Sequence, residues 1–102
     1  MNAVAGSEVR KIIVACDAGM GSSVLVATQL AGALAEFSVT VKSASVHEIP
    51  ADTDIVLCQR GLVTRVRAVV PDKVVLGFQL FLGDPVFDQV VRAIRRDERV
   101  VG

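Results

Sequence analysis

The stretch Lys11-Ile12-Ile13-Val14-Ala15 runs directly into Cys16-Asp17-Ala18-Gly19-Met20-Gly21-Ser22-Ser23, and this junction decides the fold. The five residues before the cysteine form a short apolar run, which is typical of a strand buried on both faces of a parallel sheet. After the glycines, apolar residues recur at helical spacing at positions 24, 27, 30, 31 and 34. This spacing predicts a helix over residues 21–35 that begins where the glycine loop ends.

Strand and helix patterns alternate along the rest of the chain. Further strands are predicted at 38–45, 54–58 and 73–77, and a helical pattern at 62–70. Asp84 and Pro85 have the residue types of an N-cap and a first helical position, so a last helix is expected to begin there. Because parallel neighbours need crossovers, we expect an α/β fold of the Rossmann-like type. Its sheet is predicted to have four parallel strands in the order 2-1-3-4, with helices on both faces.

The length and composition of the chain restrict the classes of function that it can have. The chain has 102 residues, and the 11 Lys and Arg residues balance the 11 Asp and Glu residues, which disfavours a nucleic-acid partner. We expect one domain over residues 9–97, a flexible N-terminal arm at 1–8 and a C-terminal tail at 98–102. Two cysteines without zinc-ligand spacing favour a reducing cytoplasm and no metal site. No apolar run approaches the roughly 20 residues that span a bilayer.

The glycine loop has the features of a phosphate cradle. Gly19 and Gly21 allow main-chain N–H groups to point inward, and a helix N-terminus adds its positive end. Ser22 and Ser23 can donate hydroxyl hydrogen bonds or cap the helix. Cys16 would sit at the floor of this ring, where the same donors stabilise a nucleophilic thiolate. We therefore predict that residues 17–23 bind a phosphoryl group and that Cys16 carries it, with no organic cofactor.

Other residues are expected at the same edge of the sheet. Ligands of such sheets bind at the carboxyl ends of the strands beside the reversal of strand order. Cys16 and Arg60 both fall there, so Arg60 is a candidate phosphate ligand. Cys58 can be interpreted either as a small core residue or as the partner of Cys16 in a regulatory disulfide. His47 is read as a surface residue, and an apolar docking face is considered at Met20, Phe78, Leu80, Phe81 and Leu82.

The loop resembles that of the mannitol-type enzyme IIB of the bacterial phosphoenolpyruvate-dependent sugar phosphotransferase system. The resemblance continues through Ala51-Asp52-Thr53-Asp54-Ile55-Val56-Leu57 and Arg60-Gly61-Leu62, and covers about residues 10–96. It implies that a phosphohistidine of enzyme IIA hands its phosphoryl group to Cys16. The group then passes to a sugar or sugar alcohol, mannitol being the first candidate, during uptake through the membrane-embedded enzyme IIC. The chain would be cytoplasmic, or peripheral to the inner face of the membrane through IIC.

Two alternatives remain open from the sequence. The loop is also similar to that of the low-molecular-weight tyrosine phosphatases, and this raises a phosphatase or arsenate-reductase-like activity. In that family the sixth residue after the cysteine is an arginine that would stabilise the transition state. Here it is Ser22, which argues against hydrolysis. The second alternative is a regulatory IIB-like domain. The departures at Cys58-Gln59 and Gly61 leave the sugar and the partner open.

Overall fold

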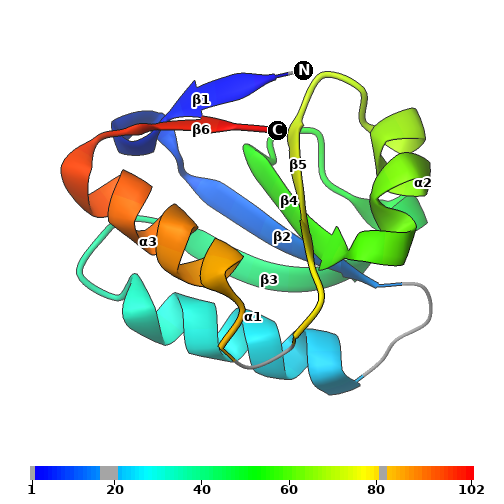
Figure 1. Cartoon of the computed structure of the whole chain (residues 1–102), viewed down its shortest axis with the longest axis horizontal. Coiled ribbons are helices and arrows are strands. Elements are labelled where there is room, and N and C mark those ends of the chain that lie inside the picture. Colours follow the sequence, from blue (N-terminus) through cyan, green and yellow to red (C-terminus); the bar gives the residue numbers. More distant parts are fainter. Residues whose placement is uncertain (1, 17–20, 81–82) are drawn as a thin grey trace.

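In a computed structural model of the protein, the described residues are 2–16, 21–80 and 83–102. The elements follow in the order β1 (Ala3–Ala5), η1 (Gly6–Glu8), β2 (Lys11–Cys16), α1 (Gly21–Ala33), β3 (Thr40–Ser45), η2 (Val46–Glu48), β4 (Ile55–Gln59), η3 (Arg60–Leu62), α2 (Val63–Val69), β5 (Val74–Phe78), α3 (Pro85–Arg96) and β6 (Arg99–Val101). The elements predicted from the sequence are therefore all present, with ends that differ by a few residues, and β1 and β6 are additional (Figure 1).

A four-stranded parallel sheet forms the centre of the molecule. Its strand order is β3-β2-β4-β5, which confirms the predicted order 2-1-3-4. Ile12 of β2 lies opposite Val41 of β3 and Ile55 of β4, and Val56 of β4 lies opposite Val75 of β5. Since both neighbours of β2 are parallel to it, the carboxyl ends of these strands meet at one edge. Cys16, the last residue of β2, lies at that edge.

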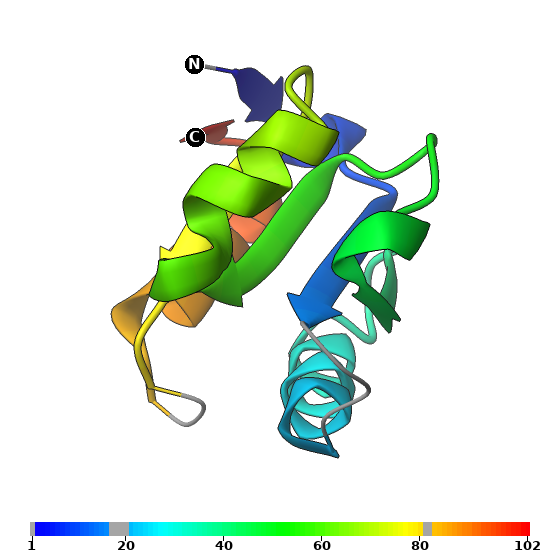
Figure 2. The ribbon, with the colours of Figure 1, turned by 90° about the vertical axis from the view of Figure 1, so that its right-hand side faces the viewer.

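The helices cover both faces of the sheet, as predicted. α1 and α3 lie on one face and α2 lies on the other (Figures 1 and 2). On the first face, β-strand residues such as Ile12, Val14 and Leu57 pack with Leu30 and Ile94 of the two helices. On the second face, a smaller core surrounds Val66 of α2 and includes Ala15, Val46, Val56, Cys58 and Val75. Alternation along each strand thus divides the buried residues between two cores.

The segments predicted as a flexible arm (1–8) and a C-terminal tail (98–102) each contain a short strand in the structure. β1 and β6 pair antiparallel, with Ala3 opposite Val101 and Ala5 opposite Arg99. We call this pair the terminal clasp, β1 with β6. The Asn2 side chain, next to β1, stabilises the clasp by donating hydrogen bonds to the carbonyl oxygens of Pro71 and Lys73, at 2.8 Å each. Strands of three residues show almost no periodicity, and each pairs with a segment more than 90 positions away, so no local pattern predicts them.

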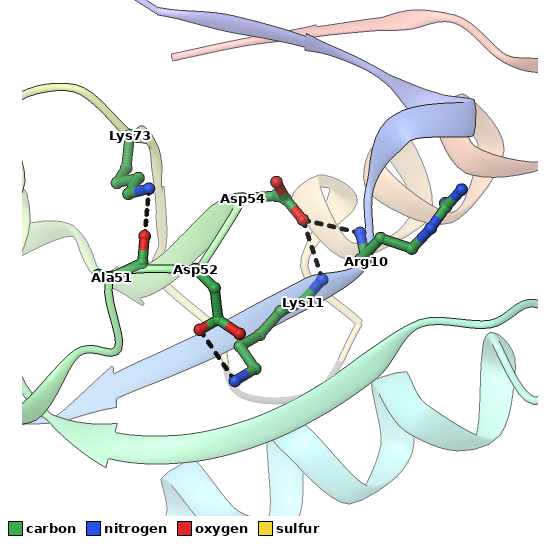
Figure 3. Close-up of polar contacts among 6 residues, drawn as sticks. All are labelled: Arg10, Lys11, Ala51, Asp52, Asp54 and Lys73. Atoms are coloured by element: carbon green, nitrogen blue, oxygen red, sulfur yellow. Dashed lines mark hydrogen bonds and ion pairs between the residues drawn. The ribbon is translucent and has the colours of Figure 1, made fainter.

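Polar contacts brace the amino edge of the sheet, opposite Cys16 (Figure 3). One oxygen of Asp54 accepts hydrogen bonds from the backbone N–H groups of Arg10, at 2.7 Å, and Lys11, at 3.0 Å. The Lys11 side chain forms an ion pair with Asp52 at 3.0 Å, and the pKa of Asp52 is lowered chiefly by that hydrogen bond. Within the described ranges, no helix is long and apolar enough to cross a membrane.

Candidate active site

Cys16 ends the central strand β2 and lies between two parallel neighbours. Its side chain is 7% exposed, so the sulfur lies just beneath the surface of the carboxyl edge. The thiol is within 3.6 Å of the carbonyl oxygen of Ala44 on β3, which accepts its hydrogen. The next residue of β3, Ser45, is the direct neighbour of Cys16 in the sheet. Only a small part of this thiol is therefore exposed to a reagent or a partner at the carboxyl edge.

Part of the predicted phosphate cradle lies outside the described residues. This applies to Asp17, Ala18, Gly19 and Met20, whose assignment as phosphate ligands stays a prediction. Gly21 is the first residue of α1, so the helix begins where the sequence predicted. Ser23, in the first turn of α1, is 4% exposed. The backbone of α1 begins five residues after Cys16, and the assignment of its first N–H groups as phosphate ligands stays a prediction.

Arg60 lies at the same edge, as expected from the topology. It opens η3 directly after β4, and its side chain is exposed. Its chain path passes over Gly77 of β5, where an added Cβ would lie 3.3 Å from the Cα and from the Cγ of Arg60. Glycine at position 77 thus permits the close passage of η3. Whether Arg60 binds a phosphoryl group stays a prediction.

Asp84 holds the loop between β5 and α3 and has a larger role than the predicted N-cap. One carboxylate oxygen accepts from the N–H of Val86 at 3.0 Å, which confirms the cap. The other oxygen accepts from the N–H groups of Gln79, at 2.8 Å, and Leu80, at 3.1 Å. These bonds, the one to Val86 first, lower the pKa of Asp84, and the charge of Arg60 lowers it further. The sequence revealed the cap but not the two bonds to the loop.

The two cysteines lie on opposite faces of the sheet. Cys58 is fully buried in the core beside α2, whereas alternation from Ile12 and Val14 directs Cys16 toward the face of α1 and α3. Both are free thiols. Burial raises the pKa of Cys58 to about 11, against an opposing effect of the charge of Arg67. The interpretation of Cys58 as a core residue is therefore confirmed, and the two thiols are not joined in this structure.

The remaining sequence candidates divide between surface and core. His47, in η2, is exposed, as predicted. Leu80 is 57% exposed at the Cys16 edge, but Phe78 is 2% exposed and packs against Phe87 with 5.2 Å between ring centroids. Phe78 is thus a core residue and not part of a docking face. Phe81 and Leu82 lie outside the described residues, as does Met20. Among the residues that the structure describes, no three acidic, histidine or cysteine side chains gather as a metal site.

Comparison with known families identifies the class of protein. Residues 11–92 match the family described as "PTS system, Lactose/Cellobiose specific IIB subunit". The matched residues include all four strands of the sheet, α1, α2 and the first eight residues of α3. The chain belongs to this phosphotransferase-system IIB family. The family membership confirms the resemblance found in the loop and agrees with the α/β fold.

Curated relatives carry the name of a different sugar from the family description. The chain is 34% identical over 90 residues to the "PTS system mannitol-specific EIICB component" of Bacillus subtilis strain 168, covering 86% of this chain and 19% of that protein. It is 36% identical over 91 residues to the protein of the same name from Halalkalibacterium halodurans, covering 87% and 19%. It is 35% identical over 95 residues to the "PTS system mannitol-specific cryptic EIICB component" of Escherichia coli strain K12, covering 91% and 20%. The chain thus spans about a fifth of the length of these relatives.

Proposed function

We propose that this chain is a cytoplasmic IIB phosphocarrier in which Cys16 receives a phosphoryl group from a phosphohistidine of enzyme IIA. The observation that carries the proposal is the position of Cys16. It lies at the carboxyl end of the central parallel strand, just beneath the surface and shortly before the N-terminus of α1. This arrangement suits a nucleophile whose phosphorylated form is held by main-chain N–H groups.

The proposed transfer has two balanced steps. In the first, the Cys16 thiolate attacks phosphorus, the S–P bond forms as the P–N bond to the donor histidine breaks, and the imidazole takes up a proton. In the second, a hydroxyl of the sugar attacks phosphorus, the P–S bond breaks, and Cys16 leaves as a thiolate while the hydroxyl proton is released. Stabilisation of the leaving thiolate by nearby dipoles favours the second step.

The acceptor is proposed to be a sugar alcohol, mannitol first, carried through enzyme IIC. The names of the curated relatives support mannitol, whereas the family description names lactose and cellobiose. Phosphoryl transfer can be measured with membranes that contain a mannitol-type IIC and with mannitol, lactose and cellobiose offered in parallel. Mannitol phosphate as the main product supports the proposal, and preference for a disaccharide overturns this part of it.

The direct test is mass spectrometry after incubation with phosphorylated IIA. We expect the mass of one phosphoryl group on the peptide that contains Cys16, and none in Cys16→Ser, whose side chain is nearly the same size. Cys58→Ser is the matched control, because it removes the other thiol from the opposite face, and it should keep the label if it folds. Label on another residue, or none on the wild type, would exclude the phosphocarrier.

Hydrolysis separates this proposal from the phosphatase alternative. Ser22 stands where the phosphatases have an arginine, and Asp84 has both carboxylate oxygens occupied by backbone N–H groups. An acid that accepts three hydrogen bonds as a carboxylate is unsuited to donate a proton to a leaving group. We therefore expect negligible hydrolysis of p-nitrophenyl phosphate, and turnover at a phosphatase rate would favour the enzyme alternative.

A further inference from the structure

Asp84 connects three backbone segments at the Cys16 edge. Its residue is only 9% exposed, and its two oxygens accept from Gln79 and Leu80 at the end of β5 and from Val86 in the first turn of α3. We call these three bonds the Asp84 clamp. Bonds from N–H groups to an ionised carboxylate are shorter and stronger than neutral ones. The clamp therefore fixes how the chain leaves the sheet at β5.

The clamp lies at the same carboxyl edge of the sheet as Cys16, two strands away from it. β5 and β2 run parallel in one sheet, and both carry the chain to the end of the molecule where α1 begins (Figure 2). Asp84 also lines a groove of about 180 Å³ between α1 and α3, together with Val26, Leu30 and Phe87. Asp84 thus lies opposite the middle and the end of α1, the helix that follows Cys16.

The clamped segment is exposed where a phosphoryl donor has to approach. Cys16 is 7% exposed, so a donor protein must fit closely over the carboxyl edge to bring its phosphohistidine to the sulfur. Leu80, whose backbone N–H is held by Asp84, is 57% exposed at the same edge. A segment that is already ordered does not have to be ordered during docking, and the entropy of ordering it is then not lost on binding.

We propose that Asp84 is a positioning residue for phosphoryl transfer, because its clamp on Gln79 and Leu80 holds in place the surface that the phosphorylated IIA must contact. The inference rests on the proposed function and adds a residue to it. Asp84 touches neither the sulfur nor the phosphoryl group. Its loss therefore weakens donor docking and leaves the chemical step unchanged.

Asp84→Asn removes the bonds to Gln79 and Leu80 while keeping the helix cap, so it distinguishes these two roles of Asp84. The amide oxygen can still accept from Val86, but the amide NH2 then faces the N–H groups of Gln79 and Leu80, so donors meet donors. Asp84→Ser is the second variant, since serine is a good N-cap that lacks the second oxygen without introducing a donor pair. Both variants lose the hydrogen bonds to Gln79 and Leu80. Only Asp84→Asn adds repulsion between its amide NH2 and those two N–H groups.

Asp54→Asn provides the matched control. One oxygen of Asp54 also accepts from two successive backbone N–H groups, those of Arg10 and Lys11 (Figure 3). These lie at the amino edge of the sheet, at the other end of β2 from Cys16. The same chemical change is thereby made at the opposite end of the sheet. All proteins are assayed well below their unfolding temperatures, which removes differences in global stability from the comparison.

The experiment is a rate measurement of Cys16 phosphorylation over a range of concentrations of a mannitol-type IIA protein, phosphorylated through phosphoenolpyruvate and the general system proteins. For both Asp84 variants we expect the KM for phosphorylated IIA to rise about tenfold, a change of about 1.4 kcal/mol, with kcat within about threefold. Asp54→Asn should keep both values within about twofold.

Two results would overturn the inference. One is a KM for the Asp84 variants that matches that of Asp54→Asn, and the other is a fall in kcat with an unchanged KM. Failure of the proposed function looks different, because the wild type itself would then carry no phosphoryl group on Cys16 at any concentration of the donor.

Discussion

Replacing Gly6 by alanine tests whether the terminal clasp forms. Gly6 is buried in η1, and a Cβ built there would overlap the carbonyl oxygen of Ala93 and lie 2.7 Å from its carbonyl carbon and 3.0 Å from the Cα of Ile94. All three atoms belong to the backbone of α3, so no side-chain rotation relieves the clash. Gly6 does not have a positive φ, and the substitution is therefore penalised by contact alone.

The structure can respond to the clash in two ways, and the one that costs less free energy sets the expected loss of stability. If η1 shifts away from α3, the strain is that of an overpacked core, about 1–3 kcal/mol. If the clasp detaches, Val100, 7% exposed, returns to water at about 1.5–3 kcal/mol, and backbone bonds such as that of Gly6 to Glu98 are lost as well. The shift is less costly, so we expect a loss of about 2 kcal/mol in the free energy of unfolding.

Urea denaturation measures this loss. With an m-value of roughly 1–3 kcal/mol per molar, the midpoint should fall by on the order of 1 M while the slope stays unchanged. Gly32→Ala is the control, because an added Cβ in α1 meets nothing within 4 Å, and alanine should raise stability by up to about 1 kcal/mol. A flexible arm at residues 1–8 would tolerate Gly6→Ala, so a midpoint equal to that of the wild type would refute the clasp.

Two further predictions concern buried polar groups. Thr53 is 1% exposed, and its hydroxyl has no hydrogen-bond partner among the described residues. Thr53→Val should therefore raise the free energy of unfolding, measured by urea denaturation, by about 1 kcal/mol. A lower free energy of unfolding would mean that the hydroxyl is hydrogen-bonded in solution. Burial raises the pKa of Cys58 to about 11. Iodoacetamide at pH 8 should therefore modify Cys16 in the native protein and Cys58 only after unfolding. Equal labelling of the two cysteines in the native protein would contradict the buried position of Cys58.

Much of the fold was predictable because its signals are local. The apolar runs that form β2, β4 and β5 are largely buried parallel strands, and such runs can be recognised in the sequence without knowing which strands they pair with. α3 was marked by Asp84 and Pro85 at its start. The clasp was not predictable, because pairing of Ala3 with Val101 depends on the ends of the chain meeting after the sheet has formed.

The candidate site was predictable in position but not in orientation. The junction at Cys16 identified the strand end, and the topology placed Cys58 at the same edge. The assignment of the two thiols to opposite faces needs the register of β2 against β4, which pairs Val14 with Leu57. The Asp84 clamp was hidden for a related reason. Its bonds to Gln79 and Leu80 depend on the three-dimensional path of the loop, and no residue type at those positions signals a backbone donor.

The clasp also brings both ends of the chain together on one side of the molecule. Asn2 donates to carbonyl oxygens just before β5, and a Cβ added to Gly102 would lie 2.7 Å from the carbonyl oxygen of Val75. Both ends of the chain therefore lie near the amino end of β5. Figure 2 places them at the end of the molecule opposite the carboxyl end of β2. A domain joined at either end would therefore be attached away from Cys16. In the proposed phosphocarrier, such an attachment would leave the carboxyl edge free to contact donor and acceptor in turn.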